Sequence, residues 1–154
     1  MSKVSIEERL ASIAEADRLQ LAPTDQILSV ARVIMTGKRP VAYLIDIVPV
    51  HYLRQQDLAA NFNGSVLDLF LSRGEPELLS SRCAINAVTA SHQVARALNI
   101  QRGDVLLWFG AILYSSMGRV VDYSFSYFLP GYFRFHVVRR VGDMNNSHAW
   151  AGSV

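Results

Sequence analysis

The chain repeats a pattern of residues with a spacing of about eighty positions. Residues 37–53 read GKRPVAYLIDIVPVHYL, and residues 118–135 read GRVVDYSFSYFLPGYFRF. Each stretch begins with a glycine turn, continues as an apolar strand pattern, reaches a proline and ends in aromatic residues. Two copies are too few for a solenoid, which needs about three. They are enough to build one sheet from two strand hairpins related by pseudo-twofold symmetry.

Positions outside the two hairpins extend the repeat. Four residues of the first half recur in the second at an offset of 79: Ala16, Leu19, Leu21 and Asp25 match Ala95, Leu98, Ile100 and Asp104. Tyr43 matches Tyr123 at 80, and Pro49 matches Pro130 at 81. This drift predicts a small insertion near residues 115–116. The repeat unit is a helix, a turn, a strand, a glycine turn, a strand and a proline, and a cleft between two such units is the natural ligand site.

Hydrophobic periodicity and turn residues predict the elements within this repeat. Ser5 and Glu8 form a capping-box pattern, so we expect a helix from about residue 5 to residue 20. Strands are predicted at residues 27–35 and 41–48, followed by a short helix that begins after Ser65 and ends at Gly74. The second half is expected to contain a strand at residues 82–90, a helix at 91–100, and strands at 105–114, 120–129 and 133–140.

The composition is typical of one compact domain. The chain has 154 residues, of which 51% are hydrophobic and 18% charged, and this is enough for a buried core. We expect a ligand-binding domain at residues 1–141 and a flexible C-terminal tail at residues 142–154. The formal charge is only +2 and the basic residues are scattered, so the chain itself is a poor candidate for direct DNA binding.

Several other classes of function have no support in the sequence. The single cysteine, Cys83, lies in an apolar run and is predicted to be buried, and the four histidines show no metal-ligand spacing. We therefore expect no metal and, without a phosphate-loop or dinucleotide glycine pattern, no cofactor. No apolar run is long enough to span a membrane, and the charged N-terminus does not resemble a signal peptide. These features predict a cytoplasmic protein with no membrane partner.

Four stretches together resemble the UTRA domain, the effector-binding domain of the HutC subfamily of GntR transcriptional regulators, which shares the chorismate lyase fold. SVARVIMTGKRPVAYLIDIVP is similar to the family's strand, its G-x-P-V-A turn and the strand that follows. NGSVLDLF is similar to its Gly-Ser-Leu-Tyr helix start. INAVTASHQVARALNIQRGDVLLWF resembles its Ala-rich helix and Pro-Gly turn, and GRVVDYSFSYFLPGYFRFHVV resembles its G-x-P-V-E-Y strand. The resemblance covers about residues 14–141.

The resemblance implies an α+β fold, in which an antiparallel sheet is built from two pseudo-symmetric hairpin repeats with helices packed on one side. It implies a sensor: a small acidic metabolite binds between the repeats and changes DNA binding by a winged helix-turn-helix domain. No stretch of this sequence resembles that domain, and either a truncation or a natural loss would account for this. We therefore expect DNA to be a partner only through an N-terminal domain absent from this chain. The resemblance and the long apolar hairpin strands also suggest a homodimer.

Residues 63–65, Asn-Gly-Ser, lead directly into the predicted short helix. Free backbone N–H groups and the helix dipole at such a start favour an anion, and Gly64 lets a ligand approach the backbone. The residues alone favour a simpler role for Ser65, that of a helix cap. The resemblance implies that Ser65 and the neighbouring amides of Gly64 and Val66 bind a phosphate or carboxylate of the effector.

Arg32 and Asp122 interrupt apolar strand patterns. An unpaired buried charge is costly, so each side chain either faces solvent at a strand edge or has a partner. The resemblance implies that Arg32 meets the effector's acidic group. A second family arginine is replaced by Ile34, which favours a carboxylate over a dianionic sugar phosphate. Asp122 matches a family glutamate that accepts hydrogen bonds from the effector. Ser126 and Phe128 share its strand face, and Phe128 replaces a tyrosine that hydrogen-bonds ligand.

Asp46 carries less weight as a ligand residue, because the family's first-hairpin glutamate aligns with Leu44. The alternative function is an enzyme of the chorismate lyase type, acting on an aromatic or enol acid. In the proline-anchored alignment, one of the lyase's arginines falls on Ile45 and its glutamate on Ser126, so groups that hold its acid are missing. A purely structural dimerisation module is a third possibility. We therefore expect a sensor without catalytic activity.

Overall fold

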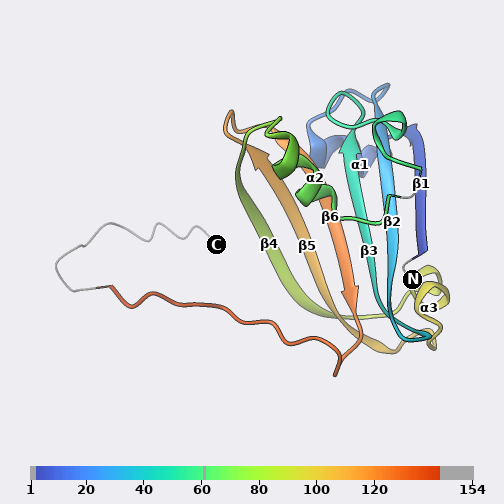
Figure 1. The fold of residues 1–154 in the computed structure, drawn as a ribbon. Helices are drawn as coiled ribbons and strands as arrows, with labels where there is room; N and C mark the ends of the chain where they lie inside the picture. Colours follow the sequence, from blue (N-terminus) through green and yellow to red (C-terminus); the bar gives the residue numbers. More distant parts are fainter. Residues whose placement is uncertain (1–2, 61, 143–154) are drawn as a thin grey trace.

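A computed structural model describes residues 3–60 and 62–142 of the chain (Figure 1). The expected tail at residues 142–154 lies almost wholly outside the described residues. In chain order the elements are β1 (Lys3–Leu10), α1 (Ile13–Leu19), β2 (Gln26–Thr36), β3 (Arg39–Pro49), a 3-10 turn η1 (Gln55–Asp57), α2 (Val66–Arg73), β4 (Leu78–Thr89), α3 (His92–Leu98), β5 (Val105–Ser115) and β6 (Val120–Phe128).

The six strands form one antiparallel sheet in the order β1-β2-β3-β6-β5-β4. Each half of the chain contributes a strand, a helix and a hairpin, so the second strands of the two hairpins, β3 and β6, meet at the centre. Their register is symmetric, since Tyr43 lies opposite Tyr127 and Ile47 lies opposite Tyr123. These two pairs exchange under an offset of 80 residues. The repeat predicted from the sequence is therefore confirmed, and it relates the halves by a pseudo-twofold axis.

A β-bulge interrupts each hairpin at the same point of the repeat. In the first hairpin, Ile34 lies opposite Ala42 while Met35 lies opposite Pro40, so Val41 is the extra residue. The second hairpin has Val121, 80 positions later, in the same role, because Leu113 pairs with Asp122 and Tyr114 with Val120. The two hairpin turns differ in length, residues 37–38 against residues 116–119, which confirms the predicted insertion. A bulge reverses the face on which all later side chains of a strand lie.

The helix predicted from residue 5 to residue 20 is wrong in its first half and confirmed only as α1. Lys3–Leu10 is an edge strand whose alternate side chains, Val4 and Ile6, pack on the core of the sheet. The capping box that the structure uses lies seven residues further on, where Ser12 and Glu15 bond each other's backbone N–H groups at the start of α1. A period of two in residues 3–10 was hidden by charged residues, which are common on an exposed edge strand.

Helices cover both faces of the sheet, so the expectation of helices on one side is wrong. α1 and α3 pack on one face, where Leu19 meets Ile27 and Leu98 meets Tyr43. α2 packs on the other face through its fully buried Val66 and Phe70, against a cluster that includes Leu28, Val30 and Val48. We call this second face the α2 face. The α+β class and the doubled antiparallel sheet are confirmed.

Two further predictions differ from the structure. The segment at residues 133–140 is extended, but it pairs with no strand among the described residues and leaves the sheet on the side of β4 (Figure 1). Cys83 is exposed and not buried, because it lies in the exposed stretch of the edge strand β4. Within residues 3–60 and 62–142, no helix is long and apolar enough to cross a membrane.

Candidate functional site

Arg32 is a charged side chain held inside the sheet. It has the same strand parity as Leu28 and Val30, so it projects from the α2 face, and it is only 8% exposed. Its Nη1 donates to the backbone oxygen of Gly64 at 2.7 Å, and its Nη2 donates to Oδ2 of Asp46 at 3.3 Å. Its Nε is buried and has no hydrogen-bond partner among the described residues. Arg32 therefore links the loop before α2 to the sheet, and its Nε–H group remains without a hydrogen-bond partner.

Asp46 and Asp122 complete a buried charged cluster with Arg32. Asp46 lies on β3, and Asp122 follows the bulge in β6 and accepts from the backbone N–H of Ile47 at 3.2 Å. Burial raises the pKa of Asp46, although the Arg32 charge opposes this rise. Burial raises the pKa of Asp122 further, and the charge of Asp46 adds to that effect. With one cation and two buried carboxyl groups, the cluster favours a proton shared between the carboxyls.

The start of α2 lies beside this cluster. Ser65 is the N-cap, and its Oγ accepts from the backbone N–H of Asp68 at 3.3 Å, so the capping role predicted from the residues is confirmed. The N–H groups of Gly64, Ser65 and Val66 find no acceptor among the described residues. Gly64 is exposed, whereas the side chain of Val66 is fully buried in the core. Any contribution of Val66 to a ligand is therefore made by its backbone.

Ser126 and Phe128 lie on the α2 face but further from the charged cluster. Ser126 is opposite Leu44, which is in turn opposite Arg32, so three adjacent strands place these side chains in one row. With strands about 4.8 Å apart, Ser126 lies roughly 10 Å from the Arg32 strand position. Phe128 lies opposite Ala42, one pleat further along. The predicted common face of Asp122, Ser126 and Phe128 agrees with the observed register.

Of the seven predicted residues, the structure brings Arg32, Gly64, Ser65 and Val66 together, and it joins Asp122 to them through Asp46. Sequence reasoning undervalued Asp46, the direct partner of Arg32. It also missed Phe109, which lies opposite Ser126, and the contribution of the C-terminal segment. The alternation of side chains along β5 would place Phe109 on the α2 face, but only once the order of the strands is known.

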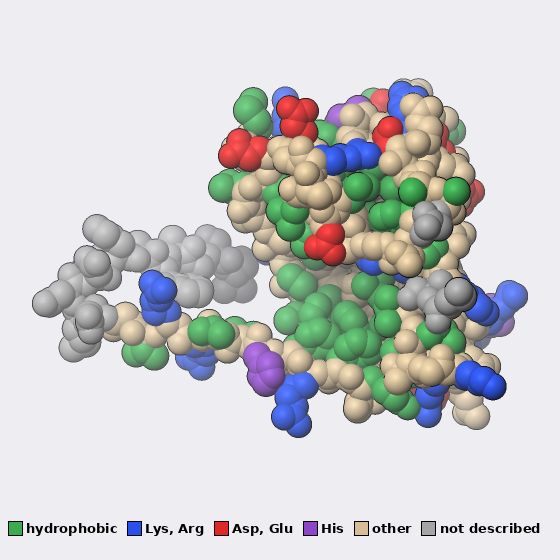
Figure 2. Space-filling view, viewed as in Figure 1, with side chains coloured by type: hydrophobic (Ala, Val, Ile, Leu, Met, Phe, Trp, Pro, Cys, Tyr) green, Lys and Arg blue, Asp and Glu red, His purple; other side chains and the backbone are tan. Residues whose placement is uncertain are grey.

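An apolar surface occupies the α2 face beside the charged cluster. Leu44, Phe109, Ala111 and Phe128 are half-buried and share this face by register. Figure 2 shows apolar side chains gathered in a recess of the sheet below α2. The recess therefore has a polar end, at Arg32 and the start of α2, and an apolar floor across β3, β6 and β5.

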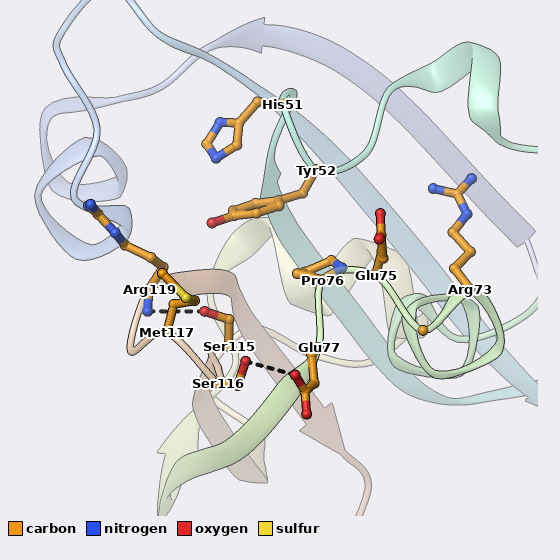
Figure 3. Close-up of a pocket in the computed structure, with 11 residues that line it drawn as sticks. His51, Tyr52, Arg73, Glu75, Pro76, Glu77, Ser115, Ser116, Met117 and Arg119 are labelled. Carbon is orange, nitrogen blue, oxygen red and sulfur yellow. Dashed lines mark hydrogen bonds between the residues drawn. The ribbon is translucent and has the colours of Figure 1, made fainter.

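Another hollow lies elsewhere. An open pocket of about 1020 Å³ separates the C-terminal end of α2 from the β5–β6 turn (Figure 3), and its lining includes His51, Tyr52, Arg73, Glu77 and Arg119. Its polar groups are exposed or satisfied within the chain, as where Ser116 Oγ lies 3.2 Å from Glu77 Oε2. Among the described residues, Nε of Arg32 on the α2 face is the only buried side-chain donor without a partner, so the α2 face is the candidate site.

Among the described residues, no group of three or more histidine, cysteine or acidic side chains is arranged to hold a metal ion. The candidate site is a recess in which a guanidinium, two carboxyl groups and helix amides adjoin an apolar floor. A sheet doubled by pseudo-twofold symmetry, with such a recess on one face, has the architecture of a small-molecule-binding domain.

Comparisons with known proteins identify the family. The sequence model of the UTRA domain matches residues 2–134, and the chain therefore belongs to the UTRA domain family. A GntR-family transcriptional regulator from Enterococcus faecalis has 25% identity and a TM-score of 0.79, with coverage of 90% of this chain and 100% of that one. A GntR-family regulator from Bacillus cereus has 18% identity and a TM-score of 0.80, with coverages of 91% and 98%. A comparison with curated proteins finds no match.

A further solved structure is described as the ligand-binding domain of a GntR-family regulator, from Bordetella bronchiseptica. It has 17% identity and a TM-score of 0.78, with coverage of 91% of this chain and 88% of that one. The family membership confirms the resemblance to the UTRA domain of GntR-family regulators and the regulatory, effector-sensing class of function predicted from the sequence; the HutC subfamily stays a prediction. The relatives are transcriptional regulators and not enzymes, so the lyase alternative gains no support.

Proposed function

We propose that this domain binds a small acidic effector in the recess of the α2 face and that binding controls a DNA-binding domain of the HutC type. The observation that supports this most directly is the buried Nε of Arg32, which has no partner among the described residues beside free amides at the start of α2. A charge-assisted hydrogen bond to such a donor is among the stronger polar contacts available to a ligand. DNA is contacted through an N-terminal domain of the longer regulator, in the cytoplasm.

The proposed ligand residues have distinct tasks. Arg32 and the amides of Gly64, Ser65 and Val66 hold the acidic group, because all four lie at the junction between β2 and α2. Asp122 acts through its link to Asp46 and sets the charge of the cluster. Ser126 and Phe128 contact the remainder of the effector from the floor. Binding at this junction would bias the position of α2 relative to the sheet, which is a route to a conformational signal.

Thermal-shift screening against a metabolite library tests the proposal. A ligand at 100-fold its Kd adds about 2.7 kcal/mol, or roughly 5–10 °C for a domain of this size. The matched control is the double variant Arg32→Met/Asp46→Leu, which removes both charges of the buried pair. We expect acidic hits to stabilise the wild type and to lose that effect in the double variant. Hits that shift both proteins equally would place the effector elsewhere.

We also propose that the domain is a homodimer assembled through β4. The two edges of the sheet differ in protection: β1 carries Lys3, Glu7, Glu8 and Arg9, whereas the longer β4 carries only Arg82. Charged residues discourage edge pairing, and their scarcity on β4 permits it. On β4, Leu79 is 69% exposed and Ile85 is 53% exposed.

The C-terminal segment supports the same assembly. Residues 133–140 have the pattern of a strand, run out past the β4 side of the sheet and find no strand partner among the described residues (Figure 1). Val137 and Val138 are almost fully exposed. A strand of a second copy could form backbone hydrogen bonds with this segment. Light scattering that shows a monomer at high micromolar concentration would contradict a dimer.

A further inference from the structure

The phenylalanine cluster at the far end of the recess points to the chemical class of the effector. Phe109 of β5 and Phe128 of β6 have ring centroids 5.2 Å apart. Phe135, from the segment after β6, lies 4.4 Å from Phe109 and 4.8 Å from Phe128. Phe133 lies 4.8 Å from Phe128. Three separate parts of the chain thus build one aromatic wall.

This wall remains open to a ligand. Phe133 is 36% exposed and Phe135 is 42% exposed, and Phe109 and Phe128 are half-buried. Between the wall and Arg32, the row across the sheet presents Leu44 and then Ser126. Three strand spacings separate Arg32 from Phe109, a span of roughly 14 Å. A phenylalkyl group or a medium-chain acyl group covers a distance of this kind.

The charges in the recess do not suit a sugar phosphate. Arg32 is the only buried lysine or arginine among the described residues, and Asp46 already opposes its charge. A phosphate dianion would face two carboxyl groups, Asp46 and Asp122, with that single cation. A carboxylate carries half the charge, and the raised pKa values of the two aspartates let them accept a proton as it binds.

The floor of the recess also offers few partners for the hydroxyl groups of a sugar. By register, Ser124 and Ser126 are the hydroxyl side chains that β6 offers on the α2 face, and their cross-strand neighbours on β5 are Ala111 and Phe109. Polar groups of a ligand that lose water without gaining a hydrogen bond weaken binding. Apolar groups lose nothing there, and burial of their surface favours binding.

We infer that the effector is an apolar monocarboxylic acid, with its carboxylate near Arg32 and an aromatic or alkyl body on the floor formed by Leu44, Phe109 and Phe128. Phe133 and Phe135 close the apolar end. The inference rests on the proposed effector site and adds the class of molecule that it takes. The proposed class is narrower than acidic metabolites in general, because it excludes sugar phosphates.

Ligand-detected NMR and calorimetry with defined probes test the inference. The probes are 4-phenylbutyrate, the neutral 4-phenylbutanol, glucose 6-phosphate and the alkanoates from hexanoate to dodecanoate. We expect at least one apolar acid to bind with a Kd below about 1 mM and glucose 6-phosphate not to bind in that range. Tighter binding of glucose 6-phosphate, or no binding by any apolar acid, would overturn the inference.

Matched variants separate this inference from the site on which it rests. Phe128→Ala removes part of the wall, and Phe125→Ala is its control, because Phe125 lies on the same strand but packs on the opposite face. We expect roughly ten-fold weaker binding of the apolar acid in the first and unchanged binding in the second. Phe133→Ser makes the same test on an exposed residue if Phe128→Ala does not fold, with circular dichroism as the check.

The outcomes can be told apart. If the double variant Arg32→Met/Asp46→Leu abolishes acid binding while Phe128→Ala and Phe133→Ser leave it unchanged, the site stands and the apolar class is wrong. If the phenylalanine variants weaken binding and the double variant binds 4-phenylbutyrate as well as the wild type does, the carboxylate position is wrong. Loss of affinity in both sets, with 4-phenylbutanol weaker than 4-phenylbutyrate in the wild type, supports the full inference.

Discussion

Arg32 and Asp46 form a buried ion pair, with Nη2 of the arginine 3.3 Å from Oδ2 of the aspartate across the β2–β3 hairpin. The pair lies diagonally, since Arg32 is opposite Leu44 and Asp46 is opposite Val30. The pair uses only part of the hydrogen-bonding capacity of each side chain. Nε of Arg32 has no partner among the described residues, and Asp46 also interacts with Asp122. The pair therefore links β2 to β3, and it also leaves the Nε–H group of Arg32 able to donate a hydrogen bond to a ligand.

Removing one partner of this pair should destabilise the domain more than removing both. Arg32→Met leaves two buried carboxyl groups without a cation, so we expect a loss of about 3–5 kcal/mol in the free energy of unfolding at neutral pH. Arg32→Met/Asp46→Leu replaces the pair by apolar groups and should be close to the wild type. Urea unfolding of the wild type, both single variants and the double variant gives the coupling energy. A loss in the double variant equal to the sum of the losses in the two single variants would mean that the pair is not coupled.

Asp122 should make the stability of the domain fall as the pH rises. Its pKa in the folded protein is raised well above the ordinary 3.8 by burial and by Asp46. Between those two pKa values the folded state binds more protons than the unfolded state, so the stability contribution present below pH 3.8 is lost as pH rises through the folded pKa. Asp122→Asn cannot ionise and keeps an acceptor for the N–H of Ile47.

The test for Asp122 is a difference profile. In that pH window, we expect the free energy of unfolding of Asp122→Asn to gain on the wild type by up to about 1.4 kcal/mol per pH unit. Asp17→Asn, which removes an exposed carboxyl group of α1, is the control for the loss of one aspartate. A flat difference profile for Asp122→Asn would show that the pKa of Asp122 is not raised in the folded domain.

Much of this architecture follows from the sequence. The repeat predicts the two hairpins, and the Asn-Gly-Ser start of α2 predicts the N-cap that Ser65 provides. β1 was missed because the helical capping signal of Ser5 and Glu8 competes with a weak alternation of apolar residues. Tertiary contacts decide such a case, since Val4 and Ile6 gain a core to pack against only when β2 is in place.

The sequence could not show that Asp46 is the partner of Arg32, because the face on which Asp46 lies depends on a bulge. A regular two-residue hairpin at residues 37–38 would put Arg32 opposite Tyr43, and Asp46 would then lie on the other face of the sheet. The extra residue Val41 shifts the pairing by one position and brings Asp46 to the α2 face beside Arg32. The position of a bulge is a property of the paired strands, which local residue patterns specify poorly.

Assembly through β4 predicts an asymmetry between the two edges of the sheet. Ile85→Lys adds a charge to the exposed edge strand β4 and should shift a dimer toward monomer. Ser5→Lys adds the same charge to β1, which already carries four charged residues, and should leave the assembly unchanged. Light scattering over a range of concentrations gives the dimer dissociation constant for each variant. Equal effects of the two substitutions would argue against β4 as the interface.

Two serine caps with the same local role allow the effector site to be separated from helix stability. Ser65 accepts from the backbone N–H of Asp68 at 3.3 Å, and Ser91 accepts from that of Val94 at 3.4 Å at the start of α3. Each change to alanine should lower the free energy of unfolding by about 1 kcal/mol, because each removes one N-cap. Only Ser65 adjoins Gly64 and Arg32, whereas Ser91 caps a helix on the opposite face of the sheet. Calorimetry with an acidic ligand should therefore show weaker binding by Ser65→Ala and wild-type affinity for Ser91→Ala; equal affinities would reduce Ser65 to a cap.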